Sequence, residues 1–152
     1  MGSNEELLAK IKMQAGDIKD AMQLKEENLS AMRAILRISP MPLEQCQSGS
    51  FNQDACYTQL VNGLKTTESL LSSAHQYTTT GLTDLLLDLQ ELISNFEETM
   101  MEKGIPVPAT SPQTLRSDIS EFQEKAGIFL ILHDLCKSLT AFQEGLAAQS
   151  VM

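Results

Sequence analysis

The side chains of this sequence whose chemistry depends most on spacing are three cysteines and two histidines: Cys46, Cys56, Cys136, His75 and His133. Paired cysteines act as metal ligands, as redox centres or as structural disulfides. The sequence contains no C-x-x-C, which excludes a thioredoxin-like redox motif, and none of its Cys and His spacings resembles a zinc finger. His133 and Cys136 are three positions apart and could share a helical face, either as two metal ligands or as a core thiol beside a partly exposed imidazole.

Catalytic motifs are also missing. Neither histidine has a glutamate three residues before it, so the sequence lacks the inward-facing Glu-x-x-His pairs of di-iron helix bundles. No motif places Ser, His and Asp together as in a hydrolase. We therefore expect a protein that is not an enzyme and that holds no metal and no cofactor.

Composition limits the class of partner. The chain has 152 residues, 42% of them hydrophobic, which favours one folded domain with a sizeable core. Its formal net charge of -9 argues against nucleic acids and anionic membranes as partners, because both need a basic patch. No apolar run approaches the ~18 residues of a membrane-spanning helix. Residues 1–3 (MGS), with no signal-peptide pattern after them, are interpreted as an expression scar, and residues 4–152 as the single domain.

Four long amphipathic helices must position these side chains, because helical periodicity dominates the sequence and strand signals are almost absent. The cap signals are Asn52 before the second helix, Gly104 with Pro106 after the third, and Ser111-Pro112 before the fourth. The first helix has a gap in its periodicity near Lys25. The predicted helices cover residues 4–37, 53–76, 82–103 and 112–148.

Four amphipathic helices bury their apolar stripes together in an all-α four-helix bundle. The predicted connections are about fifteen, five and eight residues long. A connection of fifteen residues spans about 50 Å, which exceeds the roughly 38 Å of a 25-residue helix. This long–short–long order favours the up-up-down-down topology of long-chain cytokine bundles, and the alternative is an up-down-up-down bundle with slack loops.

A disulfide between Cys46 and Cys56 would close a loop of eleven residues at the start of the second helix. Such a loop stabilises a fold by roughly 2–3 kcal/mol in the chain-entropy model. The pairing implies an oxidising compartment and leaves Cys136 as a free thiol. Asn28-Leu29-Ser30 is a glycosylation sequon, which agrees with secretion.

The two cysteines of the pair also open a family signature. The pattern C-x9-C-x6-G-L-x2-[F/Y]-x3-L resembles that of the interleukin-6, granulocyte colony-stimulating factor and myelomonocytic growth factor family, and Thr67 replaces its aromatic residue. The segment QSGSFNQDAC is most similar to interleukin-6, whereas LTDLLLDLQELISNFEETMMEKG and FQEKAG are similar to granulocyte colony-stimulating factor. The resemblance covers residues 46–146, and the matching positions are Cys46, Cys56, Gly63, Leu64 and Leu71.

The resemblance implies a secreted, extracellular cytokine that is a monomer when free. Its partners would be class I cytokine receptor ectodomains, a specific chain and a shared signal-transducing chain, which it brings together to signal in immune or haematopoietic cells. The interleukin-6 and granulocyte colony-stimulating factor branches both stay open. An intracellular helical-bundle adaptor is the alternative of another class, and it predicts three free thiols where the cytokine predicts one.

Five residues are candidates for receptor binding. By resemblance to interleukin-6, Phe51 matches a receptor-contacting phenylalanine, with a loop plug as the alternative, and Phe122 matches an aromatic that contacts a third receptor domain. Phe122 also falls on the apolar stripe, which makes a core residue the alternative. Glu144 stands where interleukin-6 has an arginine important for the specific receptor. Met13 and Leu87 lie off their core stripes and are candidate surface anchors.

Overall fold

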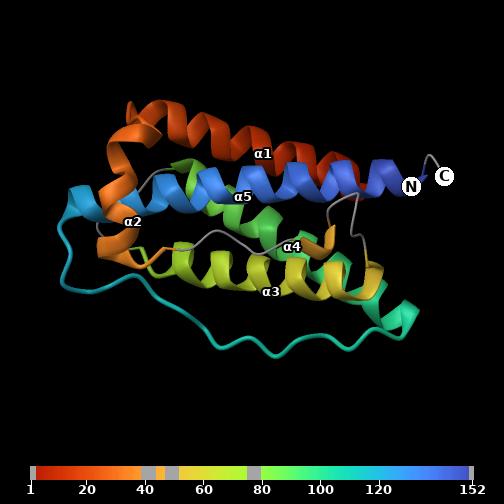
Figure 1. Ribbon diagram of the computed structural model, residues 1–152. Coiled ribbons are helices and arrows are strands. Elements are labelled where there is room, and N and C mark those ends of the chain that lie inside the picture. Colours follow the sequence, from red (N-terminus) through yellow and green to blue (C-terminus); the bar gives the residue numbers. More distant parts are fainter. Residues whose placement is uncertain (1–2, 39–43, 47–51, 75–79, 151–152) are drawn as a thin grey trace.

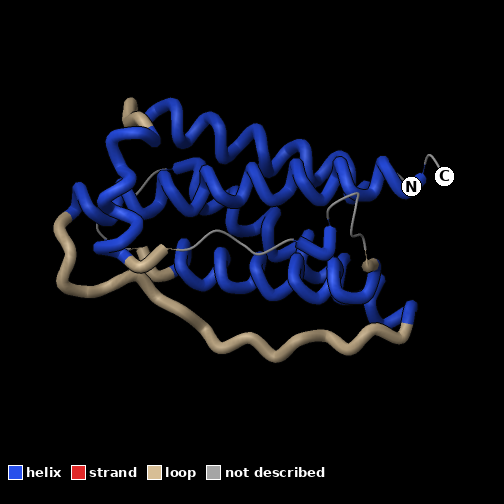
Figure 2. Tube along the Cα trace, in the orientation of Figure 1, coloured by secondary structure: helices blue, strands red, loops and turns tan. Residues whose placement is uncertain are grey.

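The computed structural model describes residues 3–38, 44–46, 52–74 and 80–150, and this part of the chain is helical with no strand (Figures 1 and 2). It forms a bundle of four long helices, with a short α-helix and two 3-10 helices in the first connection. In chain order the elements are α1 (Ser3–Met22), η1 (Glu26–Leu29), α2 (Ser30–Leu36), η2 (Glu44–Cys46), α3 (Gln53–Ser72), α4 (Thr80–Lys103) and α5 (Glu121–Ser150).

The first predicted helix is divided in two, so the expectation of one helix over 4–37 is wrong. Helix α1 ends at Met22 because Gln23 adopts a left-handed conformation with φ 57°. Lys25 is extended, and helical structure resumes only with η1 and α2. The break falls where the apolar periodicity has its gap, so the sequence contained the signal.

The predicted start of the fourth helix is also wrong. Helix α5 begins at Glu121, and the N-cap is Ser120 rather than Ser111. The Ser120 hydroxyl accepts a hydrogen bond from the Gln123 backbone N–H at 3.1 Å, and the Gln123 side chain accepts one from the Ser120 N–H at 2.9 Å. This reciprocal capping box satisfies two helix-end donors, which Ser111-Pro112 cannot do. The third connection therefore covers residues 104–120, and it runs the length of the bundle (Figure 1).

Helix α1 packs on α4 and α5, and α3 packs on the same two helices. Helix α4 is antiparallel to both α1 and α3. Residues of increasing number along α1, and likewise along α3, contact residues of decreasing number along α4. The hydrogen bonds and ion pairs that show this are Asn4–Asn95, Gln14–Asp88, Lys65–Glu97 and Glu68–Gln90. The start of α1 and the end of α5 lie at one end of the bundle (Figure 1).

The core contains an aromatic cluster contributed by three helices. Tyr57 of α3, Phe96 of α4 and Phe142 of α5 meet edge to face, with ring centroids 5.4–5.9 Å apart. Burial raises the pKa of the Tyr57 hydroxyl. None of the helices in the described residues is long and apolar enough to span a bilayer.

Candidate functional site

The predicted disulfide is present. Cys46 of η2 is bonded to Cys56 of α3, and both are fully buried against the core. The start of α3 is also fixed by Asn52, whose side chain caps the Ala55 N–H at 3.1 Å and whose N–H donates to the Gln45 carbonyl at 2.8 Å. The disulfide therefore joins the end of the first long connection to a capped helix start. The candidate Phe51 lies outside the described residues.

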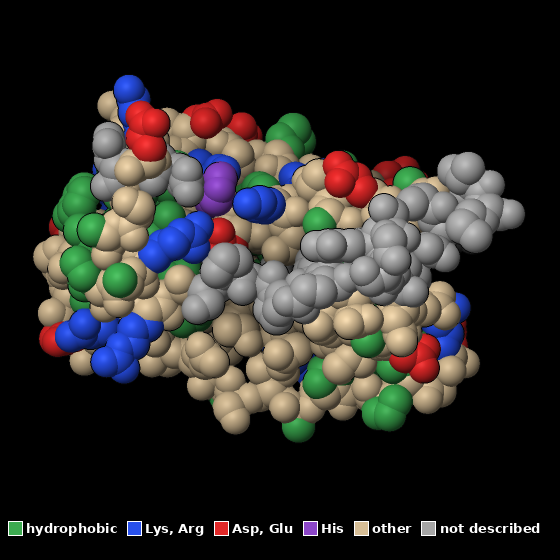
Figure 3. All heavy atoms as spheres, in the orientation of Figure 1, with side chains coloured by type: hydrophobic (Ala, Val, Ile, Leu, Met, Phe, Trp, Pro, Cys, Tyr) green, Lys and Arg blue, Asp and Glu red, His purple; other side chains and the backbone are tan. Residues whose placement is uncertain are grey.

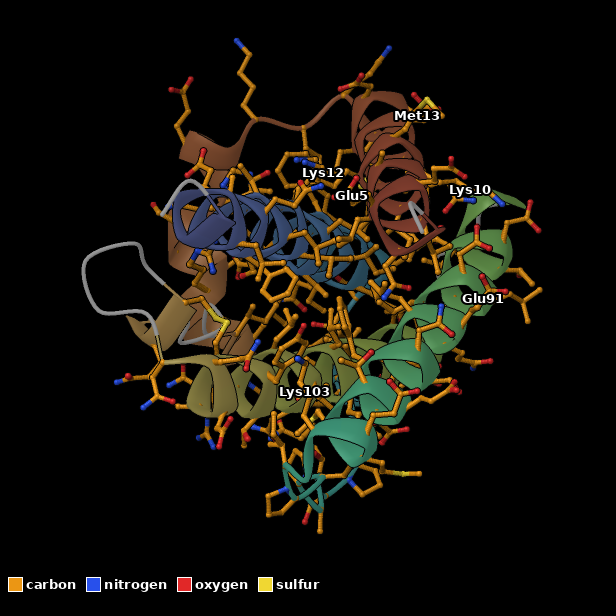
Figure 4. All side chains as sticks on the ribbon, turned by 90° about the vertical axis from the view of Figure 1, so that its right-hand side faces the viewer. Glu5, Lys10, Lys12, Met13, Glu91 and Lys103 are labelled. Carbon is orange, nitrogen blue, oxygen red and sulfur yellow. A yellow bond between two sulfur atoms is a disulfide. The ribbon has the colours of Figure 1, made fainter. Side chains whose placement is uncertain are left out.

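Two exposed apolar side chains flank the junction of α1 and α4. Met13 is 64% exposed and Leu87 is 60% exposed. The residue after each of them takes part in a hydrogen bond between the helices, from Gln14 to Asp88 at 2.9 Å. Lys10 also pairs with Asp88 at 3.1 Å, and Figure 4 shows Lys10 and Met13 on the outer side of α1. We call Met13 and Leu87, with the polar groups between them, the side surface.

Two more exposed apolar side chains belong to the end of the bundle where α2 ends and α5 begins, and hydrophobic side chains gather at this end, at the left of Figure 3. Phe122 is 50% exposed. The alternative that Phe122 is a core residue is therefore wrong. The helix starts only one residue earlier, and Phe122 therefore belongs to its first turn rather than to a continuous helical stripe with Ile119. Ile35 of α2 is 42% exposed, and its carbonyl accepts a hydrogen bond from Arg116 at 3.1 Å. We call Ile35, Arg116 and Phe122 the end surface.

Arg116 is oriented by a neighbouring carboxylate. Its guanidinium donates to both oxygens of Asp118, at 3.1 and 2.8 Å. The hydrogen bonds from Arg116 lower the pKa of the Asp118 carboxyl, and the same contact raises the pKa of Arg116. Because the pair is exposed, it adds little stability. Its effect is to orient the Arg116 guanidinium, which donates to the carbonyl of Ile35.

A groove of about 580 Å³ lies between α1 and α5. Glu144 is exposed at this groove, which also contains both His133 and Cys136. These two residues therefore share a face, as their spacing indicated. Within the described residues, no three His, Cys, Asp or Glu side chains converge to hold a metal ion. The groove is lined by Lys19, His133, Cys136, Lys137, Thr140, Ala141 and Glu144.

Cys136 is a half-buried free thiol in this groove. Its sulfur lies 3.9 Å from the Lys12 carbonyl oxygen. Burial raises the pKa of the thiol, and the positive charges of Lys19 and Lys12 oppose this shift without cancelling it. The thiol therefore stays protonated near neutral pH. Asn28, the glycosylation candidate, falls in η1, and its modification stays a prediction.

The sequence pattern did not single out Arg33 and Ile35 of the first connection, nor Asp134 of α5, with which Arg33 pairs. Arg33 of α2 forms a bidentate ion pair with Asp134 of α5, at 2.8 and 2.7 Å. The partners are separated by 101 positions, and no local pattern indicates such a pair. Ile35 could have been found, because it stands next to the apolar stripe that continues through Leu36.

A scan against protein-family models found no match. The chain is similar to the myelomonocytic growth factor of Gallus gallus, with 29% identity over 132 residues. The match covers 82% of this chain and 66% of the growth factor, so the chain spans about two thirds of that protein's length. This similarity supports the cytokine family that the cysteine signature indicates, and the similar protein is named a growth factor rather than an enzyme.

Proposed function

We propose that this chain is a secreted cytokine of the interleukin-6 type, which binds class I cytokine receptor ectodomains and brings receptor chains together. The observation that carries the proposal is the presence of two separate exposed apolar surfaces on one disulfide-stapled bundle, the side surface on α1 and α4 and the end surface on α2 and α5. Apolar anchors in contact with separate receptor chains would hold both on one rigid body.

The proposed topology is up-up-down-down, with α1 parallel to α3. Support comes from α4, which is antiparallel to both of these helices, and from the third connection of residues 104–120. A connection of that length can return along the whole bundle.

Secretion is supported by the disulfide. Cys46 and Cys56 are fully buried, and such a bond forms and persists in an oxidising compartment. The intracellular adaptor is disfavoured for this reason. Counting thiols under denaturing, non-reducing conditions separates the two proposals, since we expect one free thiol for the cytokine and three for the adaptor.

A granulocyte colony-stimulating factor-like growth factor is the second candidate. It is favoured by the sequence of α4 and the start of α5, whereas the cysteine loop with Phe51 favours the interleukin-6 branch. Glu144 lies at the groove beside α1, where interleukin-6 has an arginine, so we expect the specific receptor to differ from that of interleukin-6 in this contact. Phe51 remains a proposed contact to the specific chain.

The test is a binding screen of the chain against receptor ectodomains of both branches. We expect one ectodomain to bind directly and a second to join the complex. Met13→Ala and Leu87→Ala should each weaken one of these contacts about thirtyfold if the side chain is a central anchor. Met101→Ala is the matched control, because Met101 is about as exposed as Met13 and lies on α4, the helix that carries Leu87. Absence of binding to every ectodomain at micromolar concentration would refute the proposal.

A further inference from the structure

Helix α2 is too short to hold its own position. It has seven residues, about two turns, and an isolated helix of that length is not stable in water. Non-glycine residues in the left-handed region stand on either side of it, Gln23 at φ 57° and Arg37 at φ 58°. Contacts with the rest of the bundle must therefore determine where α2 lies.

A bidentate ion pair joins Arg33 of α2 to Asp134 of α5. Both oxygens of Asp134 accept hydrogen bonds from the guanidinium, at 2.7 and 2.8 Å. The side chain of Asp134 is only 9% exposed and that of Arg33 is 25% exposed. A planar, bidentate pair of this kind fixes both the distance and the rotation of the two partners, which an apolar contact does not.

Two further contacts join α2 to the start of α5 and the loop before it. The side-chain ends of Leu36 and Ile38 lie over Gly127, 3.2 and 3.5 Å from the position a Cβ atom would occupy there. Arg116 donates to the carbonyl of Ile35. The attachments thus lie on both sides of Ile35, the residue that α2 contributes to the end surface.

We propose that Arg33 and Asp134 are positioning residues for the end surface: their ion pair clamps α2 on α5 and so sets Ile35 relative to Phe122. This inference rests on the proposed function for its receptor readout, while the clamp itself is a property of the free protein. Buried ion pairs contribute little net stability compared with apolar pairs of similar size. Orientation is therefore the property that this pair adds.

The decisive variant is Arg33→Met/Asp134→Leu, which removes both charges and keeps most of the volume. Because the two charges are removed together, neither is left buried without the other, and the bundle should stay folded with nearly the parent stability. Arg33→Lys keeps the charge and loses the bidentate geometry. The matched control is Lys65→Met/Glu97→Leu, which removes a half-buried ion pair of 2.7 Å between α3 and α4.

Hydrogen exchange of the free protein tests the clamp. In the double variant, amides of residues 24–38 should exchange at least tenfold faster, while those of α1, α3 and α4 keep the parent rates. Arg33→Lys should give an intermediate increase, and the control should leave residues 24–38 unchanged. Parent-like exchange in the double variant, or an equal increase throughout the bundle, overturns the proposal.

Receptor binding tests the consequence. The double variant should bind about tenfold more weakly to the chain whose affinity depends on Phe122, and equally well to the chain whose affinity depends on Met13. If both affinities keep the parent values, the pair does not position the end surface. If the parent binds no receptor ectodomain, the proposed function fails, and the exchange rates still decide whether the clamp exists.

Discussion

Among the contacts that attach the connection from α1 to α3 to the rest of the bundle, one is ionic and one is covalent. Near the middle of α5, Arg33 pairs with Asp134 across 101 positions of sequence. Near the start of α3, Cys46 is bonded to Cys56 across ten positions. The ionic attachment is non-local and depends on charge, whereas the covalent attachment is local and depends on redox conditions.

The difference lies in what each attachment can tolerate. The disulfide constrains the unfolded chain and is lost only on reduction. The ion pair acts in the folded protein, and its loss removes the bidentate contact that we propose orients α2. In a secreted protein that is kept oxidised, the disulfide would therefore be permanent. The ion pair, which we propose supports the end surface, would be able to open locally.

Arg33→Met should have the largest effect on stability. It leaves Asp134 charged, almost fully buried and without this partner, and we expect unfolding to become easier by about 3 kcal/mol. This value is at the lower end of the range for such a change because Arg33 itself is a quarter exposed. Urea unfolding at neutral pH measures it, and the loss should be the same with and without reductant.

Cys46→Ser/Cys56→Ser should follow, with a loss of about 2–3 kcal/mol. Here the redox state matters: adding reductant to the parent should reproduce the loss, and adding it to the double variant should change nothing further. Combining this variant with Arg33→Met should give an additive loss if the two attachments are independent. A marked departure from additivity would show that they act as one unit.

Gly127→Ala should have a smaller effect, at the apolar part of the ionic attachment. The new Cβ would meet Leu36 Cδ1 at 3.2 Å, so the methyl groups above Gly127 must shift. Gly16→Ala is the matched control, since nothing lies within 4 Å of its Cβ and α1 gains helix propensity. We expect Gly16→Ala to be more stable than Gly127→Ala by about 1 kcal/mol or more in thermal unfolding. Equal stabilities would mean that α2 does not pack tightly there.

The smallest of these expected effects concerns the rate at which Cys136 is alkylated. Because burial raises the pKa of this thiol, the reactive thiolate is scarce at neutral pH, and iodoacetamide should modify native Cys136 several-fold more slowly than free cysteine. The rate should keep rising with pH beyond the range in which free cysteine has levelled off. Mass spectrometry of the oxidised native protein should find one modified site, and a second site would contradict the Cys46–Cys56 pairing.

Local signals in the sequence were sufficient for much of the fold. The bounds of α3 and α4 were predicted within a few residues, because Asn52 caps one helix and Gly104 ends the other. The cysteine pair was predicted for the same reason, as both partners lie within one loop and helix start.

Non-local structure was the part that the sequence could not supply. Leu115 and Ile119 continue the apolar period of α5 and are buried, yet they reach the core from a loop, which is why the helix was predicted to begin too early. The ion pair of Arg33 was not predicted because nothing near residue 33 indicates Asp134. The exposure of Met13 and of Leu87 was predicted, since exposure on a helix follows from its period, but nothing in the sequence indicated that the two lie on neighbouring helices.

If one bundle uses separate surfaces to bring receptor chains together, as we propose, Phe122→Ala should remove one receptor contact and keep the other. Phe122 is half exposed, so the variant should unfold within about 0.5 kcal/mol of the parent. In ultracentrifugation with both receptor ectodomains, the parent should form a complex that contains both chains, and the variant should retain one chain and lose the other. A variant that assembles both chains as the parent does, or that binds neither while remaining folded, would contradict the claim.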